Sequence, residues 1–286
     1  MTVCIAVRCP ADNSFICACD RMLSSDYNSY EPAAIKKWPI GTRWQMMFAA
    51  LDVSVVLPIY RRIVKYCADT TFSIEDVAGA FERSYREARE LMADAYLSRF
   101  KMNLGTFMRD GAQRFGPSMY LEVIRRVEAI SVGAEFLVFG FDADQMNHIF
   151  TINDEARAQS LDIEGFGTIG TGGWIANASL ISRPLPLASP DELLYRVCEA
   201  KFSSESAPTV GRSTVLSHFQ GSAEPNGIAK DVFILTEDIE AIRRIWNRRQ
   251  TMALPFKSII RLRGAMDRAM APLQIMRLIE KARDKQ

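Results

Sequence analysis

Histidine is scarce in this sequence, which has only His148 and His218 in 286 residues. It also contains no Gly-x-Ser-x-Gly segment. A serine–histidine hydrolase uses a histidine as base, and α/β-hydrolases carry the serine on the strained turn formed by Gly-x-Ser-x-Gly. The small number of histidines and the missing segment both argue against this class. The six cysteines do not have the spacing of a disulfide framework, and no signal-peptide pattern is present. The sequence therefore predicts a reducing, cytoplasmic location.

An excess of one charge and a long apolar run are also missing. The formal net charge is +1, which predicts attraction neither to nucleic acid nor to a membrane surface. The longest apolar stretch, 46–60, is too short to span a bilayer and contains Asp52. We therefore expect no transmembrane segment, no membrane partner and no nucleic-acid partner. The apolar content of 48% is typical of a globular protein with a large core.

Two patterns suggest a bound group, but both have a structural interpretation that we favour. The glycines of Gly165-Phe-Gly167-Thr-Ile-Gly170 satisfy a dinucleotide fingerprint, with Asp191 about twenty residues later. The residues before them are mixed in polarity, whereas the fingerprint follows a clean apolar strand. Cys17 and Cys19 would share one face of a strand, but cysteine often packs as a small apolar residue. We expect no cofactor and no metal.

Short strands open the predicted secondary structure, with apolar residues on both faces as in a sheet covered on both sides. We predict strands over 2–9, 14–20, 34–38 and 43–50, and a helix over 52–67. Ser73 and Asp76 form a capping box that begins a long amphipathic helix ending near Arg99. Its apolar stripe is predicted to be core; the stripe consists of Ile74, Val77, Phe81, Tyr85, Ala88, Met92, Ala95 and Tyr96.

The second half of the pattern repeats strands and then helices. Residues 104–133 are predicted to be an irregular insertion with one short helix near 118–129. Strands follow at 134–141, 147–152 and 164–169, then helices at 173–183 and 190–202, and a last strand at 229–235. This order by itself indicates an α+β protein.

The segment 238–286 differs in charge from the rest of the chain. It has 12 Lys and Arg against 5 Asp and Glu, and Pro and Gly divide it into helices such as 238–250 and 273–284. We interpret it as a basic helical appendage to a domain over 1–237. The alternatives are binding to nucleic acid or another anionic surface, and control of access to a chamber.

Thr2 is the residue with the strongest chemical signal. Removal of Met1 would leave its hydroxyl beside a free α-amine, which can act as base for the same residue's oxygen. The α-amine titrates at about 7.7–8.0, close to working pH. A nearby lysine would lower the pKa of the amine, and an acid would orient that lysine. Asp20 and the pair Lys36-Lys37 supply these residue types. The plain alternative is a chance threonine, with Asp20 capping a turn.

These residues resemble a proteasome β-type subunit or the related bacterial heat-shock-locus V peptidase. That family has a catalytic N-terminal Thr, then a strand ending in Asp-x-Arg, and then a Lys that is often the second of a Lys-Lys pair. Asp20-Arg21-Met22 and Lys36-Lys37 stand in the corresponding order. The interval from Asp20 matches Lys36 best, whereas the doublet favours Lys37, so both remain candidates. The segment from Ile169 to Trp174 resembles the family's Ile-Gly-Ser-Gly-Gly, with Thr171 in place of the Ser. Phe48-Ala49-Ala50 resembles the strand end whose backbone N–H binds the oxyanion, with Ala50 in place of Gly. The resemblance covers about 2–236.

One part of the family's site is altered. The family has an Asp and a Ser, three residues apart, that support the amine. Here Ser206 and Thr209 keep the spacing, but Ser replaces the acid and Glu205 is one residue out of register. The change affects activation of the amine, and it is where a non-catalytic subunit would first differ.

The resemblance implies a four-layer αββα sandwich of the N-terminal-nucleophile hydrolase type, with a C-terminal helical extension. It implies a threonine peptidase in a homo-oligomeric ring or stack that cleaves peptides or unfolded proteins, with an ATP-dependent unfoldase as a further partner. An inactive structural subunit and a small-amide amidase are the alternatives. Phe48 would favour an apolar side chain beside the scissile bond.

Overall fold

The computed structural model describes residues 2–24, 29–30, 36–67, 73–182, 189–222 and 227–250. By its contacts the chain divides into Met1–Arg243 and Arg244–Gln286. The first unit contains two five-stranded antiparallel sheets and a short ladder of β3 (Leu23–Ser24) with β4 (Ser29–Tyr30).

Each sheet is assembled from strands that are distant in the sequence. The first has the order β10 (Phe166–Ile169), β1 (Cys4–Cys9), β2 (Ser14–Asp20), β11 (Thr214–Gln220) and β12 (Lys230–Phe233). The second has the order β5 (Lys37–Ile40), β6 (Trp44–Ala50), β7 (Ala134–Phe141), β8 (Asn147–Ile152) and β9 (Ala158–Ser160). The central position of β1 and β2 buries the first strands of the chain.

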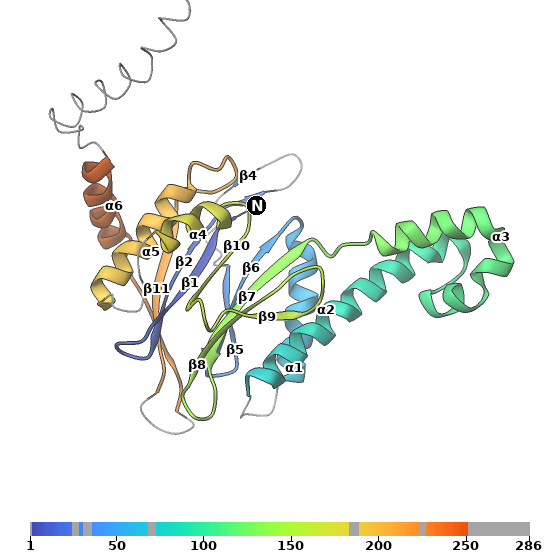
Figure 1. Cartoon of the computed structure of the whole chain (residues 1–286), viewed down its shortest axis with the longest axis horizontal. Coiled ribbons are helices and arrows are strands. Elements are labelled where there is room, and N and C mark those ends of the chain that lie inside the picture. Colours follow the sequence, from blue (N-terminus) through green and yellow to red (C-terminus); the bar gives the residue numbers. More distant parts are fainter. Residues whose placement is uncertain are drawn as a thin grey trace, which may run out of the picture. The chain divides into compact units, whose positions relative to one another are not determined.

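The two sheets pack face to face, and helices cover their outer faces (Figure 1). Cys4 and Ala6 of β1 face Leu137 and Phe139 of the other sheet, in a core between the sheets. Helices α4 (Gly173–Ile181) and α5 (Pro190–Ser204) cover the first sheet. Helices α1 (Val56–Tyr66) and α2 (Ile74–Leu97) pack on the second, in a separate apolar cluster. The predicted αββα sandwich is confirmed.

Most predicted strands lie within a few residues of those observed, but four observed strands were not predicted: β3, β4, β9 and β11. Strand β9 is only three residues long. Strand β11 alternates apolar Val215 and Phe219 with polar Thr214, His218 and Gln220, and a buried Ser217 lies between the two apolar residues. Because of this serine, the sequence shows no continuous apolar face for β11. Residues 34 and 35 of one predicted strand lie outside the described residues.

Helix α2 begins as predicted, because the Ser73 hydroxyl accepts from Asp76 N and the Asp76 carboxylate accepts from Ser73 N. The prediction that its whole stripe is core is wrong in the second half. Met92 is 36% exposed, whereas Ala93 and Leu97 are buried. The partner changes along the helix: its first half packs on the sheet, and its end packs on the next helix, which meets a different side of α2.

The prediction of irregular structure before residue 118 in the segment 104–133 is also wrong. After a single 3₁₀ turn (Ser98–Phe100), the segment forms α3 (Leu104–Glu128), with Asn103 accepting a hydrogen bond from Thr106 N at its start. A kink at Gly116, where φ is +72°, precedes Pro117. The backbone of Gly116 is not helical, so α3 consists of two helices joined at this residue. The second starts at Pro117, close to the short helix predicted near 118–129. Phe107 and Val123 of α3 pack with Leu97 in a cluster of their own.

Helix α6 (Thr236–Gln250) confirms the first helix predicted for the basic segment, and the helix predicted at 273–284 lies outside the described residues. Among the helices that the structure describes, none is both long and apolar enough to cross a membrane.

Asp162, in the loop before β10, makes hydrogen bonds to both sheets. Its carboxylate contacts His148 Nδ1 at 2.8 Å and accepts from Ile149 N at 2.8 Å, both on β8. Its carbonyl accepts from Arg8 of β1 at 2.8 Å. The hydrogen bond to Asp162 raises the pKa of His148, and Asp142, 3.2 Å from Nε2, adds to this against the effect of burial.

We expect His148→Asn to lower the melting temperature by about 2–4 °C at pH 5.5 and by less at pH 8.5. A histidine with a raised folded-state pKa stabilises the fold below its unfolded pKa of about 6.5, and this stability is lost as pH rises through the folded value. Thermal melts of both proteins at the two pH values measure the effect. An equal loss at both would contradict a charged His148.

Candidate active site

Thr2 lies directly before β1, in the interior of the protein. Its exposed fraction is 1%. The backbone is fixed from two sides: Gly172 N donates to Thr2 O at 3.2 Å, and Asp20 N donates to the carbonyl of Val3 at 3.2 Å. Gly170 has a φ of +84° and lies so close that a Cβ there would collide with the Thr2 carbonyl. The glycine turn after β10 thus seats the first residues of the chain.

Thr2, Asp20 and Lys36 form one buried, hydrogen-bonded group. The Thr2 hydroxyl donates to Asp20 Oδ1 and accepts from Lys36 Nζ. Lys36 Nζ also lies 3.1 Å from Asp20 Oδ1. Both charged side chains are almost fully buried. Burial of opposite charges is tolerated when they pair and their remaining hydrogen bonds are satisfied, as they are here. These three residues come together from the start of β1, the end of β2 and the residue before β5.

The carboxylate of Asp20 is further held by backbone donors. Oδ1 accepts from Val3 N, and Oδ2 accepts from Met22 N and Gly211 N, each at 3.1 Å. A carboxylate with this many donors is fixed in orientation. It therefore fixes the positions of the Thr2 hydroxyl and the Lys36 ammonium group.

Lys37, the other lysine kept as a candidate, is located elsewhere. Its Nζ donates to Ser217 Oγ at 2.7 Å and pairs with Asp231 at 2.6 Å. It also lies 5.3 Å from the ring centre of Phe219. Successive residues of a strand point to opposite faces, so only one lysine of the pair can face Thr2. The structure places Lys36 there.

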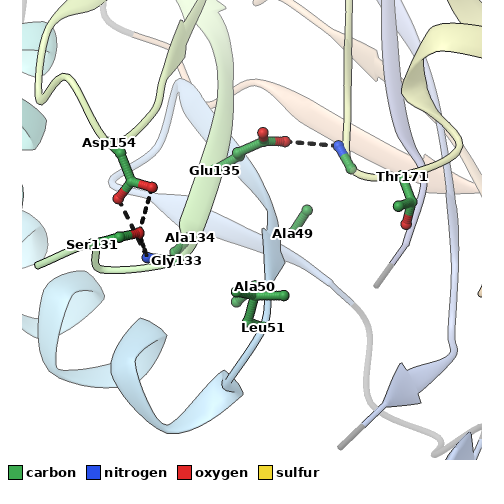
Figure 2. Close-up of a pocket in the computed structure, with 10 residues that line it drawn as sticks. Ala49, Ala50, Leu51, Ser131, Gly133, Ala134, Glu135, Asp154 and Thr171 are labelled. Atoms are coloured by element: carbon green, nitrogen blue, oxygen red, sulfur yellow. Dashed lines mark hydrogen bonds between the residues drawn. The ribbon is translucent and has the colours of Figure 1, made fainter. Parts of the chain in front are cut away.

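Ala50 lies at the end of β6, beside a pocket of about 350 Å³ (Figure 2). Phe48 N donates to Lys36 O at 3.3 Å, and strand alternation directs the N–H of Ala50 to the same edge. The side chain of Phe48 is buried against Trp38 in the core, with ring centres 4.8 Å apart. Phe48 does not line this pocket, so the predicted contact between Phe48 and a substrate is not supported there.

The lining of this pocket joins the second sheet to the glycine turn beside Thr2. Glu135 accepts a hydrogen bond from Gly170 N at 2.9 Å (Figure 2). Thr171 also lines the pocket, and its hydroxyl lies 3.0 Å from that of Thr209. The structure thus brings Thr171 and Thr209 together at the edge of the candidate site.

Glu205 and Ser206 do not make the contacts expected of groups that support the amine. The Ser206 hydroxyl donates to the carbonyl of Ser203 at 2.8 Å, as at the end of a helix. Glu205 pairs with Lys201 at 2.5 Å and with Arg243 at 2.6 Å. The one-residue offset of Glu205 therefore directs its carboxylate to a different group of charges.

Sequence reasoning missed Gly211, Lys201 and Arg243. Gly211 acts through its backbone N–H, which leaves no side-chain signal in a sequence. Lys201 and Glu205 have the i,i+4 spacing typical of an exposed helical ion pair, but Lys201 is fully buried. Its burial depends on the loop that follows α5 and on α6, so the spacing alone could not indicate it.

The structure gives little support to a metal or dinucleotide site. Among the described residues there is no group of three or more His, Cys, Asp or Glu placed to hold a metal ion. All six cysteines are buried, and each is a free thiol rather than part of a disulfide. Gly165 precedes β10, which is antiparallel to β1, whereas a dinucleotide fingerprint follows a strand of a parallel βαβ unit.

The sequence matches no protein-family model and no curated protein. The fold is similar to that of solved structures. A Gly-1 mutant of Anbu from Hyphomicrobium sp. strain MC1 is 13% identical with a TM-score of 0.59, covering 90% of this chain and 99% of its own. Anbu (ancestral beta-subunit) from Yersinia bercovieri is 12% identical with a TM-score of 0.59, covering 89% and 100%.

A eukaryotic HslV from Trypanosoma brucei is also similar, with 12% identity and a TM-score of 0.51, covering 77% of this chain and 100% of its own. Identities this low establish the fold alone. The chain has the proteasome-like, N-terminal-nucleophile hydrolase fold over nearly the whole length of these structures.

Proposed function

We propose that this protein is an N-terminal threonine hydrolase that cleaves peptide bonds. The observation that supports the proposal most directly is the buried group formed by Thr2, Asp20 and Lys36, in which one hydroxyl contacts both a carboxylate and an ammonium group. No other described threonine has this environment, and the fold supports the same class of chemistry.

In the proposed mechanism, removal of Met1 frees the α-amine of Thr2. The amine takes the proton from Thr2 Oγ as the oxygen attacks a substrate carbonyl carbon, and it returns the proton to the leaving amine. An ester between Thr2 and the acyl part of the substrate is the intermediate. Water, activated by the same amine, hydrolyses this ester and regenerates the hydroxyl.

Lys36 and Asp20 have electrostatic roles in this scheme. The ammonium group of Lys36 favours the neutral, basic form of the nearby amine and stabilises negative charge on Thr2 Oγ during attack. Asp20 holds Lys36 in position and is itself fixed by three backbone donors. The N–H of Ala50 is the proposed oxyanion donor, because it points to the strand edge beside Lys36.

The second candidate is a non-catalytic subunit with the same fold. It is favoured by the positions of Glu205 and Ser206, whose contacts are with Lys201, Arg243 and Ser203 rather than with a group at Thr2. Of the residues expected to support the α-amine, this leaves Thr171 and Thr209, whose hydroxyls lie 3.0 Å apart. We rank this candidate second, because the charged group around Thr2 is complete.

We further propose a homo-oligomeric ring or stack that encloses the sites, with unfolded polypeptide as substrate and an ATP-dependent unfoldase as partner. The support is the similarity in fold to Anbu, described as an ancestral beta-subunit, and to HslV. Electron microscopy of the purified protein tests the assembly directly.

The N-terminus of the purified protein tests the enzymatic proposal. Intact-mass analysis is expected to show loss of Met1, and a peptide epoxyketone is expected to add one equivalent to the processed chain. Retained Met1 would block the mechanism. A processed chain that forms no adduct and hydrolyses no peptide would support the non-catalytic subunit, and turnover of small amides without peptide cleavage would support an amidase.

A further inference from the structure

A second group of buried charges lies where α5 ends and α6 passes. It consists of Lys201, Glu205 and Arg243, and we call it the Glu205 cluster. Lys201 Nζ contacts Glu205 Oε1 at 2.5 Å. Arg243 makes two bonds to the same carboxylate, at 2.6 and 2.8 Å, and its guanidinium lies 4.0 Å from the ring centre of Phe202.

Two cations share one carboxylate in this cluster, so further acceptors are needed. The backbone supplies them: Lys201 Nζ donates to Gly211 O at 2.8 Å and to Arg212 O at 3.1 Å. Arg243 donates to Arg212 O at 3.0 Å. Burying a cation without hydrogen-bond acceptors costs free energy. These bonds therefore keep the carbonyls of residues 211 and 212 against the cluster.

The shared carboxylate stabilises the positive charge of both cations. Burial lowers the pKa of Lys201, and the attraction of Glu205 acts against this. Burial opposes the charge of Arg243 as well, but its hydrogen bonds to Glu205 outweigh burial and raise its pKa. A bidentate arginine–carboxylate pair also fixes the geometry of both partners.

The same short segment reaches the candidate active site. Gly211 N donates to Asp20 Oδ2 at 3.1 Å, and Asp20 Oδ1 accepts from the Thr2 hydroxyl. Gly211 is therefore held on its carbonyl side by Lys201 while its N–H holds the carboxylate of Asp20. A continuous series of hydrogen bonds joins Arg243 on α6 to Thr2.

We infer that Arg243 is a positioning residue for Asp20: through Glu205 and Lys201 it holds Gly211 where its N–H orients the carboxylate that carries Thr2 and Lys36. The inference rests on the proposed function for its effect on catalysis. It gives the last described helix of the chain a role in the site, although Arg243 makes no contact with Thr2 that the structure shows.

The test compares Arg243→Ala with Arg243→Lys, and uses Arg126→Ala as the matched control. Arg126 belongs to an exposed i,i+4 pair with Glu122 on α3, so its loss removes an ion pair without changing the cluster. Arg243→Ala is expected to lower kcat for a fluorogenic peptide about 10-fold with KM changed less than about 3-fold, since positioning acts on the reacting group rather than on binding. Arg243→Lys keeps the charge but loses the two-point contact, and is expected to fall between wild type and Arg243→Ala.

Two NMR readouts do not depend on activity. Arg243→Ala is expected to speed hydrogen exchange of the Gly211 amide about 10-fold and to shift the ¹³Cγ resonance of Asp20, whereas Arg126→Ala changes neither. If Arg243→Ala does not fold, Arg243→Lys and Glu205→Gln carry the same comparison.

The outcomes separate the two claims. A wild-type protein that hydrolyses nothing would contradict the proposed function, and the exchange and ¹³Cγ measurements would still decide whether Arg243 positions Asp20. Unchanged Gly211 exchange and an unchanged Asp20 resonance in Arg243→Ala would overturn the inference. So would an active wild type whose kcat is the same in Arg243→Ala.

Discussion

Thr2→Ala is expected to abolish peptide hydrolysis, with a loss in kcat on the order of 10⁶, the scale seen when a covalent nucleophile is removed. The reason is specific to the residue: Oγ is the attacking atom, and no other hydroxyl in the described chain shares its contacts with Asp20 and Lys36. Steady-state kinetics with a fluorogenic peptide measure the loss. Mass analysis with the epoxyketone should show no adduct in the variant.

Two variants make this result interpretable. Thr2→Ser keeps the hydroxyl and the α-amine, so it should retain measurable turnover and form the adduct. Thr106→Ala removes a threonine hydroxyl from α3, far along the chain from the group at Thr2, and should behave like wild type. Peptide hydrolysis by pure, folded Thr2→Ala would rule out Thr2 as the nucleophile.

Lys36→Met and Lys37→Met are expected to differ in their effect on activity, because only Lys36 contacts Thr2. Lys36→Met should lower kcat roughly 10²–10³-fold, the scale for loss of one charge-stabilising donor. It should also lower stability, because the fully buried Asp20 carboxylate loses its paired cation, although three backbone N–H groups still bind it. Lys37→Met should lower stability by about 1–3 kcal/mol, because it leaves Ser217 and Asp231 without their buried donor, while activity per folded molecule is retained.

Denaturant titration and peptide kinetics on the same two preparations make the comparison. The neighbouring lysines are matched in type and burial, so each variant is the control for the other. A large loss of kcat in Lys37→Met with unchanged stability, together with an active Lys36→Met, would show that the wrong lysine has been placed beside Thr2.

The local signals in the sequence predicted much of the fold. The capping box at Ser73 began α2 at the right residue, and the apolar first strands became the centre of a sheet covered on both sides. Predictions failed where the sequence pattern of an element does not show which other element it packs against. Residues 104–115 lack a strong local helix signal, yet they form the first part of α3, where Phe107 packs with Leu97 and Val123. Met92 fitted the helical period of α2 but lies where the helix has left the sheet.

For the candidate site, residue types could be predicted but orientations could not. Thr2 and Asp20 were identified from chemistry and order along the chain, and the structure brings them together. Lys36 and Lys37 both remained candidates, because the interval from Asp20 favours Lys36 whereas the register of the lysine doublet favours Lys37. Adjacent residues of a strand point to opposite faces, so only the fold shows which one faces Thr2. Glu205 remained a candidate for the family's acid although it is one residue out of register, and the structure directs it to Lys201 and Arg243.

The sequence by itself determined which chemical groups are available, because hydroxyl, carboxylate and ammonium groups are properties of single residues, and it determined the local elements whose signals lie within a few residues. Tertiary structure alone decided which lysine faces Thr2, where Glu205 points, and that Gly211 joins Arg243 to Asp20. Those contacts join residues up to 191 positions apart. Their geometry depends on how two sheets and a late helix pack, and no short stretch of sequence contains that information.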